Sequence, residues 1–273
     1  NLWHVNVDLF KEAGLVDDDG NPILPSSREE FAQQAQTMEE TTGKLYFASD
    51  ASQFPVSVRL FLALLWQQDG NIVSADGTAA NADSPEASEA LDFLLEMYDE
   101  GYSDANQNYD ASQEAFLTGE AAILHNGTWV VDQYSRETPF EYMALDFPTL
   151  YDTPATWANS HMWVIPKQAE DAKYEAALRY ITFLNDHVKD WGIGTGHLPP
   201  RKSALESEAL QAAPQRTNYS NTANIAHLVP AIVNWQATED ILKEELESTW
   251  LTGADPDEAL SNAQQRISDQ LGQ

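Results

Sequence analysis

The sequence contains no cysteine, which excludes disulfides, thiol nucleophiles and cysteine-ligated metals. Its apolar runs, such as the one from Phe61 to Trp66, are far too short to span a membrane. Basic residues are scarce as well: 14 Lys and Arg face 44 Asp and Glu, which gives a net charge of −30. Nucleic acid and anionic membranes are bound through clustered cations. We therefore expect neither nucleic-acid binding nor direct membrane insertion.

The acidic residues are scattered in short runs, for example at 17–19, 29–30 and 99–100. Three interpretations of this charge stay open. The acids form a solvated surface, or they adapt the protein to high salt, where cations screen their repulsion. The third interpretation is a calcium-loaded surface, because residues 17–21 resemble part of a calcium loop that here lacks its final glutamate.

Catalytic signatures are also missing from the sequence. There is no G-x-S-x-G elbow, H-E-x-x-H pair, P-loop or dinucleotide glycine fingerprint, and the six histidines have no metal-ligand spacing. We expect no catalytic residue, no metal site and no cofactor. An exported acidic glycosidase remains the alternative, because such an enzyme needs only a pair of carboxylates.

Alternating helix and strand signals predict an α/β protein. Ser27 with Glu30, Ser84 with Pro85, and Asp255 with Glu258 are typical of helix starts. Apolar spacing predicts helices over 56–68 and 171–185, the second with Ala177, Tyr180, Ile181 and Leu184 facing inward. Short strands are predicted at 45–48, 121–124, 142–147 and 162–165.

The segment from Tyr109 to Trp129 is the most informative stretch of the chain. It predicts a helix that ends at Gly119, a buried strand, and a tight Asn126-Gly127 turn that presents Trp129. A side chain placed after such a turn projects from the end of a strand. Trp129 is therefore a candidate ligand contact, the alternative being a core tryptophan that covers the strand end.

This segment, F-x-x-G-x-A-A-x-x-x-N-G-x-W, resembles a diagnostic region of the family 1 extracellular solute-binding proteins, the maltose-binding-protein-like receptors of carbohydrate ABC importers. NVDLFKEAGL, GHLPPRKSAL and VNWQATEDILKEEL resemble further family segments in the same order. The resemblance implies a two-lobe, periplasmic-binding-protein-like (type II) fold that lacks the first part of its N-terminal lobe. It also implies a function: capture of a sugar or oligosaccharide by lobe closure, and delivery to a membrane ABC permease.

The resemblance further implies how the chain is divided. Residues 1–152 and 213–273 are expected to form the C-terminal lobe, the latter as its closing helices, and 153–212 the returning part of the N-terminal lobe. Without the upstream part of that lobe, the apolar face with Tyr180, Ile181 and Leu184 is expected to be exposed. The alternative is a natural compact variant, in which 153–212 packs against a self-contained lobe. The expected location is extracytoplasmic, in the periplasm or at the cell surface, with a lipid anchor in a segment outside this chain.

The resemblance also implies ligand-binding residues. Trp129 and Trp235 match two tryptophans that stack on sugars, since an indole offers a flat apolar surface to the C–H face of a sugar ring. The best-known member of the family has an arginine one helical turn after the second tryptophan, where this chain has Glu239. A same-fold receptor for a non-sugar solute therefore stays open, and a cluster of Arg or Lys at the site would favour an anion.

The segment from Trp157 to Trp163 matches a crossing between lobes, so Trp157, Asn159, His161 and Trp163 are further candidates. Their alternative is a half-buried strand with an ordinary histidine. Phe54 and Arg59 correspond loosely to a ligand-facing region. Trp66 is expected in the core. Trp3 and His4 are expected to line the ligand site if the chain starts at the hinge between the lobes.

Overall fold

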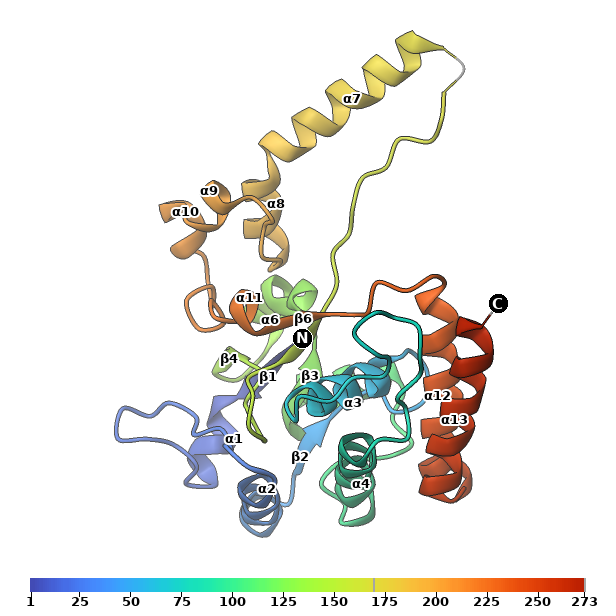
Figure 1. The fold of residues 1–273 in the computed structure, drawn as a ribbon. Coiled ribbons are helices and arrows are strands. Elements are labelled where there is room, and N and C mark those ends of the chain that lie inside the picture. Colours follow the sequence, from blue (N-terminus) through green and yellow to red (C-terminus); the bar gives the residue numbers. More distant parts are fainter. Residues whose placement is uncertain (169, 273) are drawn as a thin grey trace.

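A four-stranded sheet of order β2-β3-β1-β4 lies at the centre of the computed structural model, which describes residues 1–168 and 170–272 (Figure 1). β1 (Leu2–Asn6) is antiparallel to both β3 (Ala121–Asn126) and β4 (Tyr142–Asp146). β2 (Leu45–Ala48) runs parallel to β3. The last residues of β2, β3 and β4 and the first residue of β1 therefore lie at the same end of the strands. We call this end of the sheet the carboxyl edge.

The two faces of the sheet support two apolar cores, because successive strand residues point to opposite sides. Trp3, Phe47 and Ile123 belong to the larger core, whereas Leu2 and Leu124 belong to the smaller one. Trp3 makes edge-on contacts with three phenylalanine rings at centroid distances of 5.6–6.1 Å. Both faces of the central strands are covered, which explains their nearly continuous apolar sequences.

Helices from both ends of the chain cover the larger core. They are α1 (Val7–Glu12), α2 (Arg28–Thr42), α3 (Val56–Trp66), α4 (Pro85–Asp99), α12 (Trp235–Thr252) and α13 (Pro256–Leu271). α3 is buried along almost its whole length and contacts both α4 and α12. The smaller core lies under α5 (Tyr109–Leu117), the short η1 (Thr128–Val130) and α6 (Val131–Glu137).

The predicted helix starts are confirmed. The side chains of Ser27, Ser84 and Asp255 each accept a hydrogen bond from a backbone N–H three residues later. Gly119 follows α5 with a φ of 75°, which a glycine adopts without a steric penalty. The strands predicted at 45–48, 121–124 and 142–147 form β2, β3 and β4, and the helices predicted at 56–68 and 171–185 form as well.

Two short parallel strands, β5 (Thr156–Ala158) and β6 (Ala226–Leu228), pair beside α3. The chain leaves the main body after β5, runs outward to α7 (Asp171–Asp186), and returns to β6 (Figure 1). On the way back it forms α8 (Val188–Thr195), α9 (Lys202–Leu205), α10 (Glu208–Gln211) and α11 (Thr222–Ile225). We call residues 159–225 the excursion.

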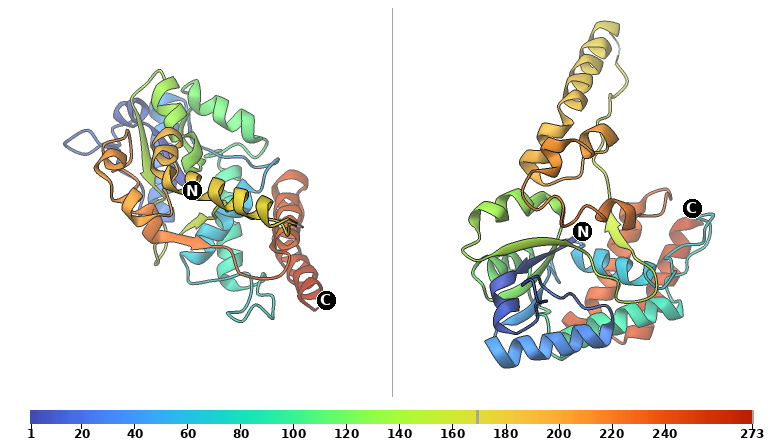
Figure 2. Two further views of the ribbon diagram at one scale, coloured as in Figure 1. Left: turned by 90° about the horizontal axis from the view of Figure 1, so that it is seen from above. Right: turned by 90° about the vertical axis from the view of Figure 1, so that its left-hand side faces the viewer.

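The excursion corrects one prediction and agrees with another. The strand predicted at 162–165 is wrong, because the segment pairs with no strand among the described residues, and Met162 is 78% exposed. The apolar face of the helix of 171–185 is exposed in this chain, as expected for a helix that belongs to another lobe, and its burial within that lobe stays a prediction. α7 stands away from the body (Figure 2). It buries no residue; Tyr180 is 61% exposed, and Ile181 and Leu184 are half-buried. The division at 152 and 212 stays a prediction.

The returning part of the excursion packs against the smaller core. Arg216 donates to the carbonyls of Gly192 and Ile193, and the buried Tyr219 hydroxyl donates to Gly196. Gly196 has a φ of 97°, and a Cβ there would lie 2.2 Å from the Thr128 carbonyl oxygen. α8 therefore touches the turn that follows β3. Across the described residues, no helix is long and apolar enough to cross a membrane.

Candidate functional site

The turn after β3 holds Trp129 against the backbone at the carboxyl edge. A Cβ on Gly127 would lie 1.9 Å from the Trp129 ring, so the indole lies directly over this glycine. The indole Nε1 donates to the Tyr109 hydroxyl at 3.0 Å. Trp129 is half-buried, which places the ring between the smaller core and the surface. The role of Trp129 as a ligand contact stays a prediction.

Tyr109 links three structural elements. It is the first residue of α5, and its hydroxyl also lies 3.3 Å from the Asn126 side-chain nitrogen at the end of β3. Its ring meets Phe54 edge-on at 5.3 Å. Phe54 is held by Asp50, whose carboxylate accepts the Phe54 N–H at 2.6 Å. Phe54, Tyr109 and Trp129 thus form one continuous set of rings, which we call the aromatic row.

Arg59 and Trp157 lie next to this row. The Arg59 guanidinium is 4.4 Å above the Trp157 ring, a cation–π geometry, and Arg59 Nε is buried without a hydrogen-bond partner. Burial lowers the Arg59 pKa, while the negative charge of Glu239 opposes this shift most strongly. Burial also raises the Glu239 pKa, and the positive charge of Arg59 opposes that shift. The two groups therefore share one electrostatic environment, although they form no ion pair.

The structure brings together four of the predicted ligand-binding residues: Phe54, Arg59, Trp129 and Trp157. Trp235 is half-buried, packs against the larger core, and lies one helical turn before Glu239 on α12. The assignment of these five residues to a ligand stays a prediction, because the contacts described so far are all within the protein.

The remaining candidates lie elsewhere. Asn159, His161 and Trp163 are on the outgoing part of the excursion; all are exposed, Trp163 to 67%. The expectation that Trp3 and His4 reach the site is wrong, because both are buried in the sheet. His4 is bonded there to the Tyr142 hydroxyl and the Gly127 carbonyl. Trp66 is buried as predicted and stacks on His227 at 4.1 Å.

The sequence did not predict two features of the site. One is Tyr109 as a member of the aromatic row, and the other is Glu239 as the electrostatic partner of Arg59. Tyr109 opens the most informative segment, and a polar aromatic at a helix start is a usable signal for a residue that bonds across elements. Nothing local in the sequence pairs Glu239 with Arg59, because 180 residues separate them and only the packing of α12 on α3 brings them close.

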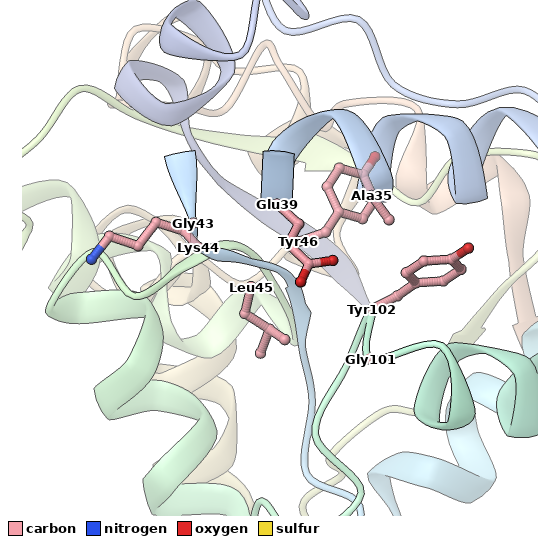
Figure 3. A pocket seen from close by; sticks show the side chains of 8 residues that line it. All are labelled: Ala35, Glu39, Gly43, Lys44, Leu45, Tyr46, Gly101 and Tyr102. Carbon is pink, nitrogen blue, oxygen red and sulfur yellow. The ribbon is translucent and has the colours of Figure 1, made fainter. Parts of the chain in front are cut away.

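Two small hollows in the structure do not include any of these residues. One, of about 190 Å³, lies between the end of α2, the start of β2 and the Gly101 turn, with Glu39, Tyr46 and Tyr102 around it (Figure 3). It is at the edge of the sheet opposite the carboxyl edge. The other, of about 230 Å³, lies among α9, α10 and α11. The described residues contain no His, Cys, Asp and Glu group that could hold a metal ion.

Comparison with known proteins decides the family. Residues 3–218 match the family model described as bacterial extracellular solute-binding protein. The chain belongs to this family. The chain also spans 63–64% of the length of the curated relatives it matches, among them the sn-glycerol-3-phosphate-binding periplasmic protein UgpB of Escherichia coli K12. That relative is 24% identical over 286 residues, covering 97% of this chain.

Solved structures agree with the family and with the expected fold. The cyclic α-maltosyl-1,6-maltose binding protein of Arthrobacter globiformis is 26% identical and superimposes with a TM-score of 0.76, over 99% of this chain and 69% of that one. An ABC transporter solute-binding protein of Thermotoga lettingae, solved with α-D-tagatose, is 21% identical and has a TM-score of 0.84, over 99% and 70%. The predicted type II periplasmic-binding-protein fold is confirmed.

Proposed function

We propose that this protein is an extracytoplasmic receptor that captures a sugar or oligosaccharide and delivers it to an ABC permease. The proposal rests on family membership and on one observation: the aromatic row lies at the carboxyl edge of the sheet. Open α/β sheets bind their ligands outside the carboxyl ends of their strands. The relatives named for a maltose-type sugar and for tagatose support a carbohydrate.

The chemistry of the row suits a sugar. Aromatic rings offer wide apolar contact surfaces to the C–H faces of pyranoses at a small cost in side-chain entropy. Trp129 is already fixed by Gly127 and Tyr109, so it needs little ordering when a ligand arrives. A polar group that can bond hydroxyls, the Arg59 guanidinium, lies beside the rings.

The division into lobes belongs to the same proposal. Residues 1–152 and 213–273 would form the lobe that carries the aromatic row, and 153–212 would belong to a second lobe that closes over the ligand. The paired β5 and β6 strands would be the crossing in this arrangement, and the exposed apolar side chains of α7 would pack within the second lobe, to which α7 belongs. Closure would bring Asn159, His161 and Trp163 toward the sugar.

The proposal is tested by calorimetric titration of the full-length gene product with maltose, trehalose and D-tagatose. We expect saturable binding of at least one sugar, and a rise in melting temperature with that sugar in excess. A matched control is Trp191→Ala, which removes an indole that is 42% exposed on α8 and lies against His197 rather than the row. The proposed surface would be contradicted if Trp191→Ala lost sugar binding while Trp129→Ala bound the sugar as tightly as the unaltered protein.

A phosphate-bearing solute is the second candidate, because the buried Nε of the Arg59 guanidinium has no hydrogen-bond partner among the described residues and a guanidinium is suited to phosphate. The Escherichia coli relative is named for glycerol 3-phosphate binding. The same titration with sn-glycerol 3-phosphate separates the two candidates.

Catalysis is a third possibility, raised by the elevated pKa of Glu239, since a general acid requires such a shift. Glycoside hydrolysis also needs a second carboxylate. The nearby Asp50 carboxylate already accepts three backbone N–H groups, from Ser52, Gln53 and Phe54. We therefore expect no release of nitrophenol from aryl-glycosides. Sustained hydrolysis that disappears in Glu239→Gln would favour the enzyme.

A further inference from the structure

The hollow of about 230 Å³ among α9, α10 and α11 includes no residue of the aromatic row. Its lining combines three leucines with two charged side chains, namely Leu198, Leu205 and Leu210 with Arg216 and Glu206. An apolar cavity of about 150 Å³ holds benzene. The hollow therefore has room for an organic molecule of roughly eight non-hydrogen atoms.

Arg216 is the buried charge of this hollow, with 3% of its surface exposed. Its two Nη atoms donate to neutral oxygens, which are the carbonyls of Pro214, Gly192 and Ile193 and the hydroxyl of Tyr219. The ion pairs that arginines form across the described residues do not include Arg216. Its Nε is buried and has no hydrogen-bond partner, so one donor of a charged group is left unsatisfied.

The position of Arg216 is fixed by contacts that leave this Nε over. Bonds from Nη2 to the last carbonyls of α8 explain that nitrogen, but not Nε. The preceding residue, Gln215, has a left-handed φ of 67°, and its side-chain amide bonds the Tyr142 carbonyl at 2.9 Å and the Ala144 N–H at 3.1 Å on β4. Such strained positions persist only where the surroundings fix them, and they cluster at functional sites. The guanidinium is therefore ordered before a ligand arrives.

We propose that this hollow is a second ligand site, for a small branched aliphatic carboxylate. A carboxylate oxygen accepts the hydrogen bond from Arg216 Nε and neutralises the buried charge. The aliphatic chain packs against Leu198, Leu205 and Leu210. Glu206 is exposed, so its charge is screened, but it favours a singly charged anion over a dianion. The site does not depend on sugar binding, because the aromatic row lies outside it.

The test is calorimetric titration of the full-length protein with 4-methylpentanoate, whose size matches the hollow. Two further compounds separate the contributions of its parts: 4-methylpentan-1-ol keeps the chain without the charge, and acetate keeps the charge without the chain. We expect saturable binding of 4-methylpentanoate. Each of the other two should bind at least about tenfold more weakly, because the alcohol loses a charged hydrogen bond and acetate loses most of the apolar contact.

A substitution on α11 tests the location without changing Arg216. Ala223→Leu adds a larger side chain to the lining of the hollow. It should weaken 4-methylpentanoate at least about tenfold without lowering the melting temperature, because the leucine occupies the space of the ligand. Ala212→Leu is the matched control: this exposed alanine follows α10 outside the lining, and its replacement should change the affinity less than about twofold.

Two substitutions test the charges. Glu206→Gln should strengthen 4-methylpentanoate by roughly two- to fivefold, since one exposed like charge is removed. Arg216→Lys keeps the positive charge but loses the planar guanidinium, and should weaken the carboxylate at least about tenfold while leaving the alcohol unchanged. Because Arg216 also bonds the end of α8, melting temperatures are measured in parallel. If Arg216→Lys fails to fold, Ala223→Leu and Glu206→Gln decide.

The outcomes separate this inference from the proposed function. Equal affinities for 4-methylpentanoate and its alcohol would overturn the inference, as would undiminished carboxylate binding in Ala223→Leu. Displacement of 4-methylpentanoate by a sugar, or its loss in Trp129→Ala, would place it at the aromatic row and overturn the inference too. Sugar binding without carboxylate binding would overturn the inference alone. Carboxylate binding without sugar binding would contradict only the proposed function.

Discussion

The substitution Gly127→Ala tests the placement of Trp129 without touching the tryptophan itself. Gly127 has φ −96° and ψ 178°, so alanine fits its backbone without strain. The added methyl would lie 1.9–2.2 Å from three indole carbons. Because carbon atoms pack at about 3.5 Å or more, the ring must move by roughly 1.5 Å. That movement breaks the 3.0 Å bond from Nε1 to Tyr109.

The expected magnitudes follow from this geometry. One lost neutral hydrogen bond destabilises the fold by about 1 kcal/mol, and the half-buried ring can swing outward rather than compress the core. Loss of a placed aromatic contact weakens sugar binding by about 1–3 kcal/mol, which is roughly 5- to 150-fold in Kd. Gly127→Ala should therefore affect binding more than stability.

Calorimetric titration and urea unfolding of the same preparations measure both effects. Gly194→Ala is the control, because a Cβ at this position in α8 meets nothing within 4 Å. It should bind like the unaltered protein and be equally or slightly more stable. Unchanged sugar affinity in Gly127→Ala, with a melting temperature lowered by several degrees, would refute the reasoning and identify Trp129 as a core residue.

Four further predictions concern the site, the charge and the excursion. Trp235→Ala should weaken sugar binding by about 1–3 kcal/mol, and unchanged affinity with reduced stability would make Trp235 a core residue alone. The melting temperature should rise steadily from millimolar to molar KCl, because salt screens a net charge of −30; a flat curve would show that the acids do not repel one another appreciably. Burial lowers the pKa of His4 from its ordinary value of 6.5 to about 3. The neutral His4 side chain therefore contributes fully to stability above pH 6.5, and this contribution is lost as the pH falls toward 3. His4→Gln should reduce the slope of unfolding free energy against pH between 6 and 4 by at most about 1.4 kcal/mol per pH unit, and an equal slope in both proteins would mean that His4 is protonated in the fold. Finally, this 273-residue chain should self-associate through α7 in sedimentation experiments, because Tyr180 and Phe183 are 61% and 58% exposed. Tyr180→Glu with Phe183→Glu should suppress association, Arg179→Glu should not, and a monomer at all concentrations would contradict the expectation.

Local features of this protein could be predicted from its sequence because their causes are local. Ser27, Ser84 and Asp255 cap helices through hydrogen bonds to residues three positions away. Gly119 adopts a left-handed backbone conformation, which a glycine does without a steric penalty. The turn after β3 was predictable for the same reason, and the resemblance that begins there led to the family.

Features that depend on distant packing could not be predicted in this way. The apolar spacing of 171–185 predicts a helix, but whether Tyr180 is covered depends on what lies beside α7. The run from Met162 has strand composition yet finds no pairing strand in the described chain. His4 alternates correctly for a strand, but its burial follows from the rings of Tyr134 and Tyr142, more than 120 residues away.

The stack of Trp66 on His227 joins a fixed helix of the main body to the strand on which the excursion returns. The two rings are 4.1 Å apart and inclined by 20°, close enough for the imidazole to alter the indole's excited state. Any motion that draws β6 away from α3 therefore changes the emission of Trp66. The emission of Trp66 is therefore an intrinsic probe of the contact between α3 and β6.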